Sequence, residues 1–239
     1  MSDLPGWLDR DDGLINYGEP TYWERRYETD KRDFGESFRH DWYLGFDKLI
    51  PTIESFFEQP TGQRILTIGC GHSEMPARMH AMGYRCITAT DISPTIITQM
   101  QQQDMDKEGL EYAVVDARKM DGFADGVFDC IFDKACADAL YCGFRSSEDV
   151  LDMCLECCRV LRPGGVFLCV SHGHPKTRMY TFGHNRLQWK ANAIPLLLGT
   201  TARGRRLQAF LHPGDFRSTP TSNFASGHTC LLLSGGVLR

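Results

Sequence analysis

The chain has 239 residues, of which 42% are hydrophobic and 24% charged, so it is long and apolar enough to fold as one ordinary α/β domain with a buried core. Its net charge of −5 argues against a protein that grips nucleic acid through phosphates, and a basic protein partner is easier to accommodate. The first residues lack a secretory leader, and no apolar run approaches the roughly 20 residues that cross a bilayer. We therefore expect a cytoplasmic protein, with a nuclear location as the alternative, and no membrane partner.

In chain order, a flexible lead-in over residues 1–20 precedes an aromatic and charged segment, residues 21–58, that ends in a helix-like stretch around 43–57. Short apolar runs then alternate with stretches of helical spacing. This alternation predicts a Rossmann-like α/β fold with a mostly parallel sheet, which binds ligands at the carboxyl ends of its strands. The expected strands are 64–68, 85–90, 111–115, 128–132 and 165–170, and the expected helices are 75–82, 94–106 and 150–161.

The tail from residue 195 is rich in Gly, Ser, Thr and Arg. Residues 195–227 read as a long loop, which is uncommon in a compact domain. The apolar run 229–233 is a candidate last strand. We therefore divide the chain into the lead-in, a domain over 21–194 and a divergent C-terminal segment over 195–239.

The turn after the first expected strand is Ile68-Gly69-Cys70-Gly71. Glycines here let the backbone approach a ligand closely. Glu74 replaces the last glycine of the dinucleotide pattern, which disfavours a pyrophosphate cofactor and leaves S-adenosylmethionine, which has no phosphate, as a candidate. An ordinary tight turn is the structural alternative.

Carboxylates follow the next two strands. Asp91 is placed to accept hydrogen bonds from both hydroxyls of a ribose, because Ser93 already serves as the N-cap before Pro94. Asp116 and the amide of Ala117 suit an adenine edge. The alternative for Asp116 is a solvated turn residue.

Asp133 and Lys134 close the fourth strand, beneath the expected methionine half of the cofactor. Asp133 either orients the acceptor of the reaction or is a buried anchor, and the sequence leaves both open. No catalytic residue beyond this candidate is identified. Lys134 is expected to act through its backbone, with its side chain elsewhere.

Aromatic residues are dense in residues 21–43, the N-terminal flap, where Trp23, Tyr27 and Trp42 lie. Such rings either pack on the core or cover a sulfonium cation. The residues alone do not decide between these roles.

Metal binding is not expected, although Cys154, Cys157 and Cys158 share a helix and His172 and His174 follow. Cysteines on the apolar face of a helix are more often buried and inert. The ten cysteines as a whole are read as reduced thiols.

Taken together, these motifs resemble the small methyltransferases related to the endothelin-converting-enzyme-2 methyltransferase, regarded as an elongation factor 1-alpha lysine methyltransferase, and to the methyltransferase-like 13 group. The resemblance runs from about residue 21 to about 194. It is carried by Tyr22-Trp23-x-x-Arg26-Tyr27, Asp41-Trp42-Tyr43, Ile68-Gly69-Cys70-Gly71-x-Ser73, Asp91-Ile92-Ser93, Asp116-Ala117-Arg118, Asp133-Lys134-x-x-x-Asp138-Ala139-Leu140 and Val160-Leu161-x-Pro163-Gly164-Gly165.

The resemblance implies a class I fold with seven strands, the last antiparallel, and S-adenosylmethionine as cofactor. It also implies which positions contact the cofactor: Trp23, Tyr27, Trp42, Gly69, Gly71, Asp91, Ile92, Asp116, Ala117 and Lys134. The chain departs from the family at Ala135-Cys136, where Gly-Thr is frequent, and after Ile194-Pro195. These departures affect the acceptor pocket and the last strand.

We therefore expect a methyltransferase that modifies a lysine of a protein such as elongation factor 1-alpha. A small-molecule methyltransferase and a non-catalytic module with the same fold are the alternatives. The sequence does not indicate the oligomeric state or the number of methyl groups added.

Overall fold

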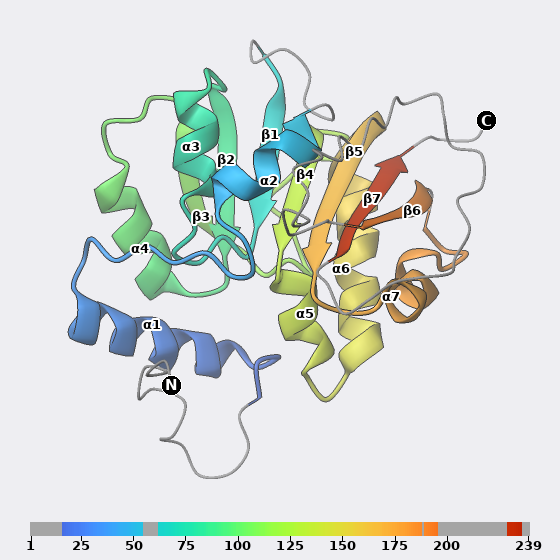
Figure 1. Ribbon diagram of the computed structural model, residues 1–239, viewed down its shortest axis with the longest axis horizontal. Coiled ribbons are helices and arrows are strands. Elements are labelled where there is room, and N and C mark those ends of the chain that lie inside the picture. The colour runs from blue at the N-terminus through green and yellow to red at the C-terminus, as the bar shows by residue number, and fades with distance from the viewer. Residues whose placement is uncertain (1–15, 55–61, 188, 196–228, 236–239) are drawn as a thin grey trace, which may run out of the picture.

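The structure is a computed structural model that describes residues 16–54, 62–187, 189–195 and 229–235. These residues form a seven-stranded sheet in the order β3-β2-β1-β4-β5-β7-β6 (Figure 1). Neighbouring strands among β1 to β5 are parallel, and β7 is antiparallel to both β5 and β6. The strands are β1 (Arg64–Ile68), β2 (Cys86–Asp91), β3 (Leu110–Val114), β4 (Phe128–Lys134), β5 (Leu161–Ser171), β6 (Trp189–Pro195) and β7 (Thr229–Gly235).

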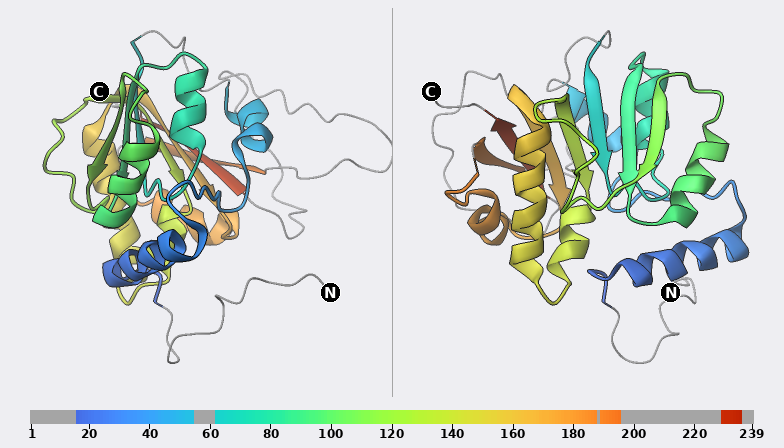
Figure 2. Two further views of the ribbon diagram at one scale, coloured as in Figure 1. Left: turned by 90° about the vertical axis from the view of Figure 1, so that its left-hand side faces the viewer. Right: turned by 180° about the vertical axis from the view of Figure 1, so that it is seen from behind.

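Helices cover both faces of the sheet, as the edge-on view shows (Figure 2, left). One core contains Leu49, Met79 and Met100 from three of the helices, and the opposite core contains Cys157 and Phe182. Two apolar faces buried in this way explain why the central strands are nearly continuous apolar runs. The helices are α1 (Pro20–Phe34), α2 (Phe46–Ile53), α3 (Met75–Ala81), α4 (Pro94–Gln103), α5 (Cys136–Tyr141), α6 (Ser146–Val160) and α7 (Pro175–Phe182).

The topology places a site at the carboxyl ends of β1 and β4. From β1 the chain runs outward through β2 and β3, then returns to β4 on the other side of β1. This reversal leaves a crevice outside the strand ends, where ligands of such sheets bind. Helix α1 crosses this edge of the sheet (Figure 1).

The expected strands and helices of the central region are confirmed, with bounds shifted by a few residues. The candidate last strand is confirmed as β7, which is antiparallel. Helices α1, α5 and α7 and strand β6 were not expected. The expected loop over 195–227 lies, apart from Pro195, outside the described residues.

The lead-in requires a correction in its last residues. Residues 1–15 lie outside the described part, but the Glu19 N–H donates to the Asn16 carbonyl at 3.1 Å and α1 begins at Pro20. Proline at the first helical position is a start signal, because its missing N–H has no helical partner to lose. The end of the lead-in is therefore ordered and belongs to the domain.

Candidate functional site

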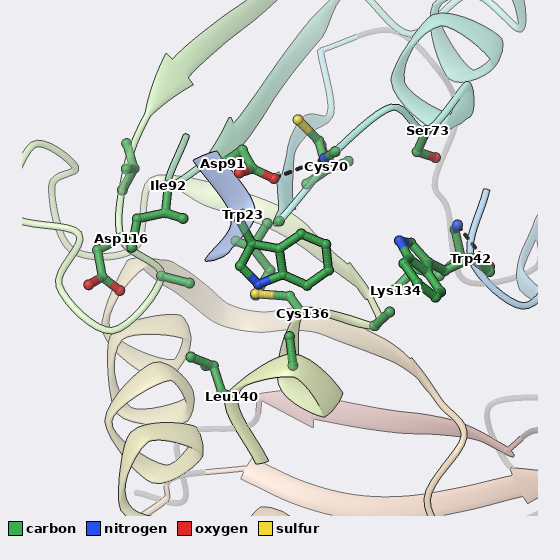
Figure 3. Close-up of a pocket in the computed structure, with 18 of the residues that line it drawn as sticks. Trp23, Trp42, Cys70, Ser73, Asp91, Ile92, Asp116, Lys134, Cys136 and Leu140 are labelled. Carbon is green, nitrogen blue, oxygen red and sulfur yellow. Dashed lines mark hydrogen bonds between the residues drawn. The ribbon is translucent and has the colours of Figure 1, made fainter. Parts of the chain in front are cut away.

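A cavity opens at the carboxyl ends of β1, β2, β3 and β4, with an empty volume of about 930 Å³ including its mouth. Its lining combines apolar side chains with a few polar groups, as is usual for small-molecule sites. Figure 3 shows Asp91, Ile92 and Asp116 towards one end, Trp42 and Lys134 towards the other, and Trp23 between them. Each of the ten residues expected to contact a cofactor lines this cavity: Trp23, Tyr27, Trp42, Gly69, Gly71, Asp91, Ile92, Asp116, Ala117 and Lys134.

The cavity is also lined by residues that were not among the expected contacts. Tyr17 and Gly18 come from the lead-in, His40 from the flap and Leu140 from α5. A turn signal, Asn16 followed by Gly18 and a helix-starting Pro20, was the one available sign that the lead-in is ordered.

The glycine turn has the backbone that its sequence predicts. Gly69 and Gly71 have φ values of 57° and 48°, in the left-handed region that favours glycine. A Cβ atom on Gly69 would lie 2.6 Å from the Cβ of Cys136, and one on Gly71 would lie 3.0 Å from the Tyr27 hydroxyl. The two glycines thus let the turn pack between α5 and the flap.

Asp91 is buried at the end of β2, with only 4% of its surface exposed. Its Oδ2 accepts the Gly71 N–H at 3.0 Å, and its Oδ1 accepts the Ser93 N–H at 3.1 Å. Burial raises the pKa of Asp91 to about 6, although these backbone hydrogen bonds act in the opposite direction. The carboxylate is fixed in orientation, and its two oxygens together retain acceptor capacity.

Ser93 is the N-cap of α4, because its hydroxyl accepts the Ile96 N–H, as the sequence predicts. This capping leaves Asp91 free of the N-cap role, as expected, although Asp91 still makes backbone contacts. Asp91 itself holds the Ser93 amide, which ties the end of β2 to the start of α4.

The Asp116 carboxylate, expected at an adenine edge, is paired with Arg118. Arg118 donates to it from its Nη2 at 2.7 Å, from its Nε and from its backbone N–H. Although burial opposes the effect, these contacts lower the pKa of Asp116, so it is ionised. Arg118 in turn pairs with the buried Asp149 of α6 at 3.1 Å, which anchors this end of the cavity.

The flap aromatics both pack on the core and line the cavity. Tyr27 is buried in the core beside α3 and α4. Trp23 lies 5.7 Å from Tyr27 and 6.3 Å from Trp42, measured between ring centroids. The Trp23 Nε1 donates to the Tyr17 carbonyl at 2.7 Å, so its polar atom is satisfied away from the sheet.

Polar contacts fasten the flap to both ends of α4. Glu24 accepts hydrogen bonds from the hydroxyls of Ser93 and Thr95 at the start of α4. Arg39 pairs with the buried Asp104 at 2.8 Å.

At the β4 end, Lys134 Nζ lies 2.9 Å from Asp41 and donates to the Trp42 carbonyl at 3.1 Å. The side chain of Lys134 therefore binds the flap. This agrees with the expectation that it extends away from the end of β4. Burial lowers its pKa, and Asp41 opposes this effect.

Asp133 does not line the cavity. It is fully buried, and it accepts the Cys136 N–H at 2.9 Å and the Cys169 thiol at 3.0 Å. Burial raises its pKa to about 7. Of the two roles left open by the sequence, its contacts support the buried anchor, and direct contact with an acceptor does not fit its position.

The departure from the family pattern at Ala135-Cys136 strains the backbone locally. Ala135 has a φ of 77°, in the left-handed region where a side chain is strained. Glycine would adopt this conformation without that strain. The Cys136 side chain points into the cavity beside Trp23 (Figure 3).

Among the described residues, no group of three or more metal-ligating side chains comes together. Cys154 and Cys157 are buried in the α6 core, as the apolar helix face indicates. No described helix has the length and apolar character that a membrane crossing requires.

Comparison with known proteins indicates the family to which the chain belongs. A family model described as "Methyltransferase domain" matches residues 66–169. EEF1A lysine methyltransferase 4 of Mus musculus is 30% identical over 183 residues, which cover 73% of this chain and 69% of that protein. The eEF1A lysine and N-terminal methyltransferase of Danio rerio is 30% identical over 159 residues, which cover 65% of this chain and 21% of that protein.

Solved structures agree at the level of the fold. A SAM-dependent methyltransferase from Methanosarcina mazei has a TM-score of 0.56 at 15% identity and covers 84% of this chain and 100% of its own. The [4+2]-cyclase SpnF has a TM-score of 0.59 at 13% identity, with 78% of each chain covered. The parallel sheet, the glycine turn and the sequence relationship lead to one conclusion. The chain belongs to the class I S-adenosylmethionine-dependent methyltransferases, in the group that contains EEF1A lysine methyltransferase 4.

Proposed function

We propose that this methyltransferase modifies a lysine side chain of elongation factor 1-alpha. The observation that carries the proposal is the 30% identity to EEF1A lysine methyltransferase 4 across most of both chains. The relationship to the zebrafish protein covers only 21% of that longer chain, so activities of its other parts are not transferred.

The cavity fits S-adenosylmethionine, judged by the donors and acceptors it presents. We place the ribose hydroxyls on Asp91, whose carboxylate is buried and held in a fixed orientation at the end of β2. We place the adenine beside Ile92, Asp116 and the Ala117 amide, at the far end of the cavity from Trp42.

The methionine half then lies along the glycine turn towards Lys134. Gly69 and Gly71 allow close approach there, and Trp23, Tyr27 and Trp42 form an aromatic cover. Aromatic faces attract a sulfonium cation and exclude water from it.

The cofactor supplies a methyl group already activated by its positively charged sulfur. The protein therefore acts by positioning, desolvation and electrostatics more than by covalent chemistry. A lysine amine, with a usual pKa of about 10.4, must reach the methyl carbon in its neutral form. The aromatic flap favours that form, because a water-poor surrounding lowers the pKa of an ammonium group.

Incubation of the purified protein with elongation factor 1-alpha and isotope-labelled S-adenosylmethionine tests the proposal. We expect label on the factor, and mass spectrometry should place it on a lysine. A parallel incubation with a cell extract of the same organism serves as the comparison. Label on another protein or on a small molecule, with none on the factor, would refute the proposed substrate and leave the methyltransferase activity intact.

A further inference from the structure

The end of the lead-in forms an ordered turn at the cavity. The Gly18 N–H donates to the Asn16 side-chain oxygen at 3.0 Å, and the Trp23 indole donates to the Tyr17 carbonyl at 2.7 Å. Tyr17 and Gly18 both line the cavity. This turn is therefore attached to an aromatic residue of the flap and contributes to the wall of the site.

The same turn packs against the turn between α5 and α6 through backbone alone. A Cβ atom on Gly18 would lie 2.3 Å from the Cα and 2.6 Å from the N of Gly143. Neither glycine has a positive φ, so close approach, and not backbone conformation, requires the missing side chains. Gly143 is itself held between α5 and α6, since it donates to the Leu140 carbonyl and accepts from Ser146.

This contact joins two segments that each contribute residues to the cavity lining, the lead-in turn and α5 with the turn that follows it. The start of α1 lies beside the turn between α5 and α6 in Figure 1 and again in the reverse view of Figure 2. Leu140, one turn before Gly143, lines the cavity from α5. The Gly18–Gly143 contact thus completes the wall that the sheet does not provide.

We propose that Gly18 and Gly143 are positioning residues of the cofactor site, and that their contact holds the lead-in turn closed over bound S-adenosylmethionine. The proposal rests on the cofactor placement given above. Release of the cofactor requires this wall to open, so the contact acts mainly on the dissociation rate. Affinity differences among variants of one interface usually lie in that rate.

Substitution by alanine at the two glycines gives a graded test. Gly18→Ala places a methyl group against backbone that no side-chain rotation can relieve. Gly143→Ala meets the Leu140 carbonyl at 3.2 Å and Gly18 Cα at 3.3 Å, which is tight but less severe. The matched control is Gly122→Ala, because Gly122 is exposed, has no atom within 4 Å of an added Cβ and has no positive φ.

The measurements are calorimetric binding of S-adenosylhomocysteine and displacement of labelled S-adenosylmethionine by an excess of it. We expect Gly18→Ala to weaken binding by about tenfold, largely through faster release. Gly143→Ala should have a smaller effect and Gly122→Ala none. Melting curves of each variant check that the fold is retained.

Unchanged affinity and release in Gly18→Ala would overturn the proposal, as would equal losses in Gly18→Ala and Gly122→Ala. If Gly18→Ala prevents folding, the milder Gly143→Ala still tests the proposal. Binding of S-adenosylhomocysteine by the unmodified protein distinguishes a failure of this proposal from a failure of the cofactor placement. If that protein fails to bind S-adenosylhomocysteine, the cofactor placement itself is wrong.

Discussion

At the scale of single residues, Asp91 carries the clearest prediction. Its ionised form accepts hydrogen bonds from two hydroxyls, whereas the protonated form must use one oxygen as a donor. Because burial raises the pKa of Asp91 to about 6, cofactor binding expels a proton below that pH. The affinity for S-adenosylhomocysteine should fall about tenfold from pH 7 to pH 5, since each pH unit below the pKa removes most of the remaining carboxylate.

Asp91→Asn should bind the cofactor more weakly and lose this pH dependence. Asparagine is preferable to alanine, because alanine would leave the buried amides of Gly71 and Ser93 without an acceptor. Burial lowers the pKa of His40, which also lines the cavity, and the comparison with Asp91→Asn separates its protonation from that of Asp91. Calorimetry between pH 5 and pH 7 measures both proteins. An identical slope in Asp91→Asn would assign the titration to another group.

Trp23 tests the aromatic cover. An aromatic face over a cation contributes about 0.5–2 kcal/mol, so Trp23→Ala should reduce affinity for S-adenosylmethionine by roughly threefold to thirtyfold. Trp23 is only partly buried, and the melting temperature should therefore change little. Trp23→Phe keeps a ring and serves as the control. A large loss of stability with unchanged affinity would show that Trp23 is purely structural.

At the scale of elements, the start of α5 contains a strained residue. Ala135 has a φ of 77°, and glycine adopts that conformation without a steric penalty. Ala135→Gly should therefore raise the free energy of unfolding by about 1 kcal/mol. Ala139→Gly, inside the same helix, should lower it by about 0.5–1 kcal/mol. Thermal or denaturant unfolding measures both, and a destabilised Ala135→Gly would contradict the strain assigned to this position.

The elements that the sequence predicts are those with a strong period. Strands buried on both faces appear as apolar runs, and α6 has a continuous apolar stripe. Helix α1 has no such stripe, since it crosses the strand ends and fully buries only Tyr27 and Asp30. Helix α5 has six residues, which is too short for a helical period. The ends of these two helices contribute much of the cavity wall that was not predicted.

At the scale of the whole molecule, the site residues at the strand ends can be predicted from the sequence. The contacts that close the cavity cannot. Motifs at the ends of β1 to β4 mark residues that a parallel sheet brings together, so Asp91, Asp116 and Gly69 meet as expected. Contacts between distant segments have no local signature. The pairing of Asp41 with Lys134 and the approach of Gly18 to Gly143 arise only after the flap folds over the sheet.

The placement of the cofactor in the cavity is tested most directly by a crystal structure of the complex with S-adenosylhomocysteine. It predicts both ribose hydroxyls within about 3 Å of the Asp91 carboxylate oxygens. It also predicts the adenine beside Asp116 and Ala117, the sulfur beneath Trp23, and the Tyr17–Gly18 turn closed against Gly143. A ligand whose ribose lies away from Asp91, or whose adenine occupies the end near Lys134 and Trp42, would contradict it.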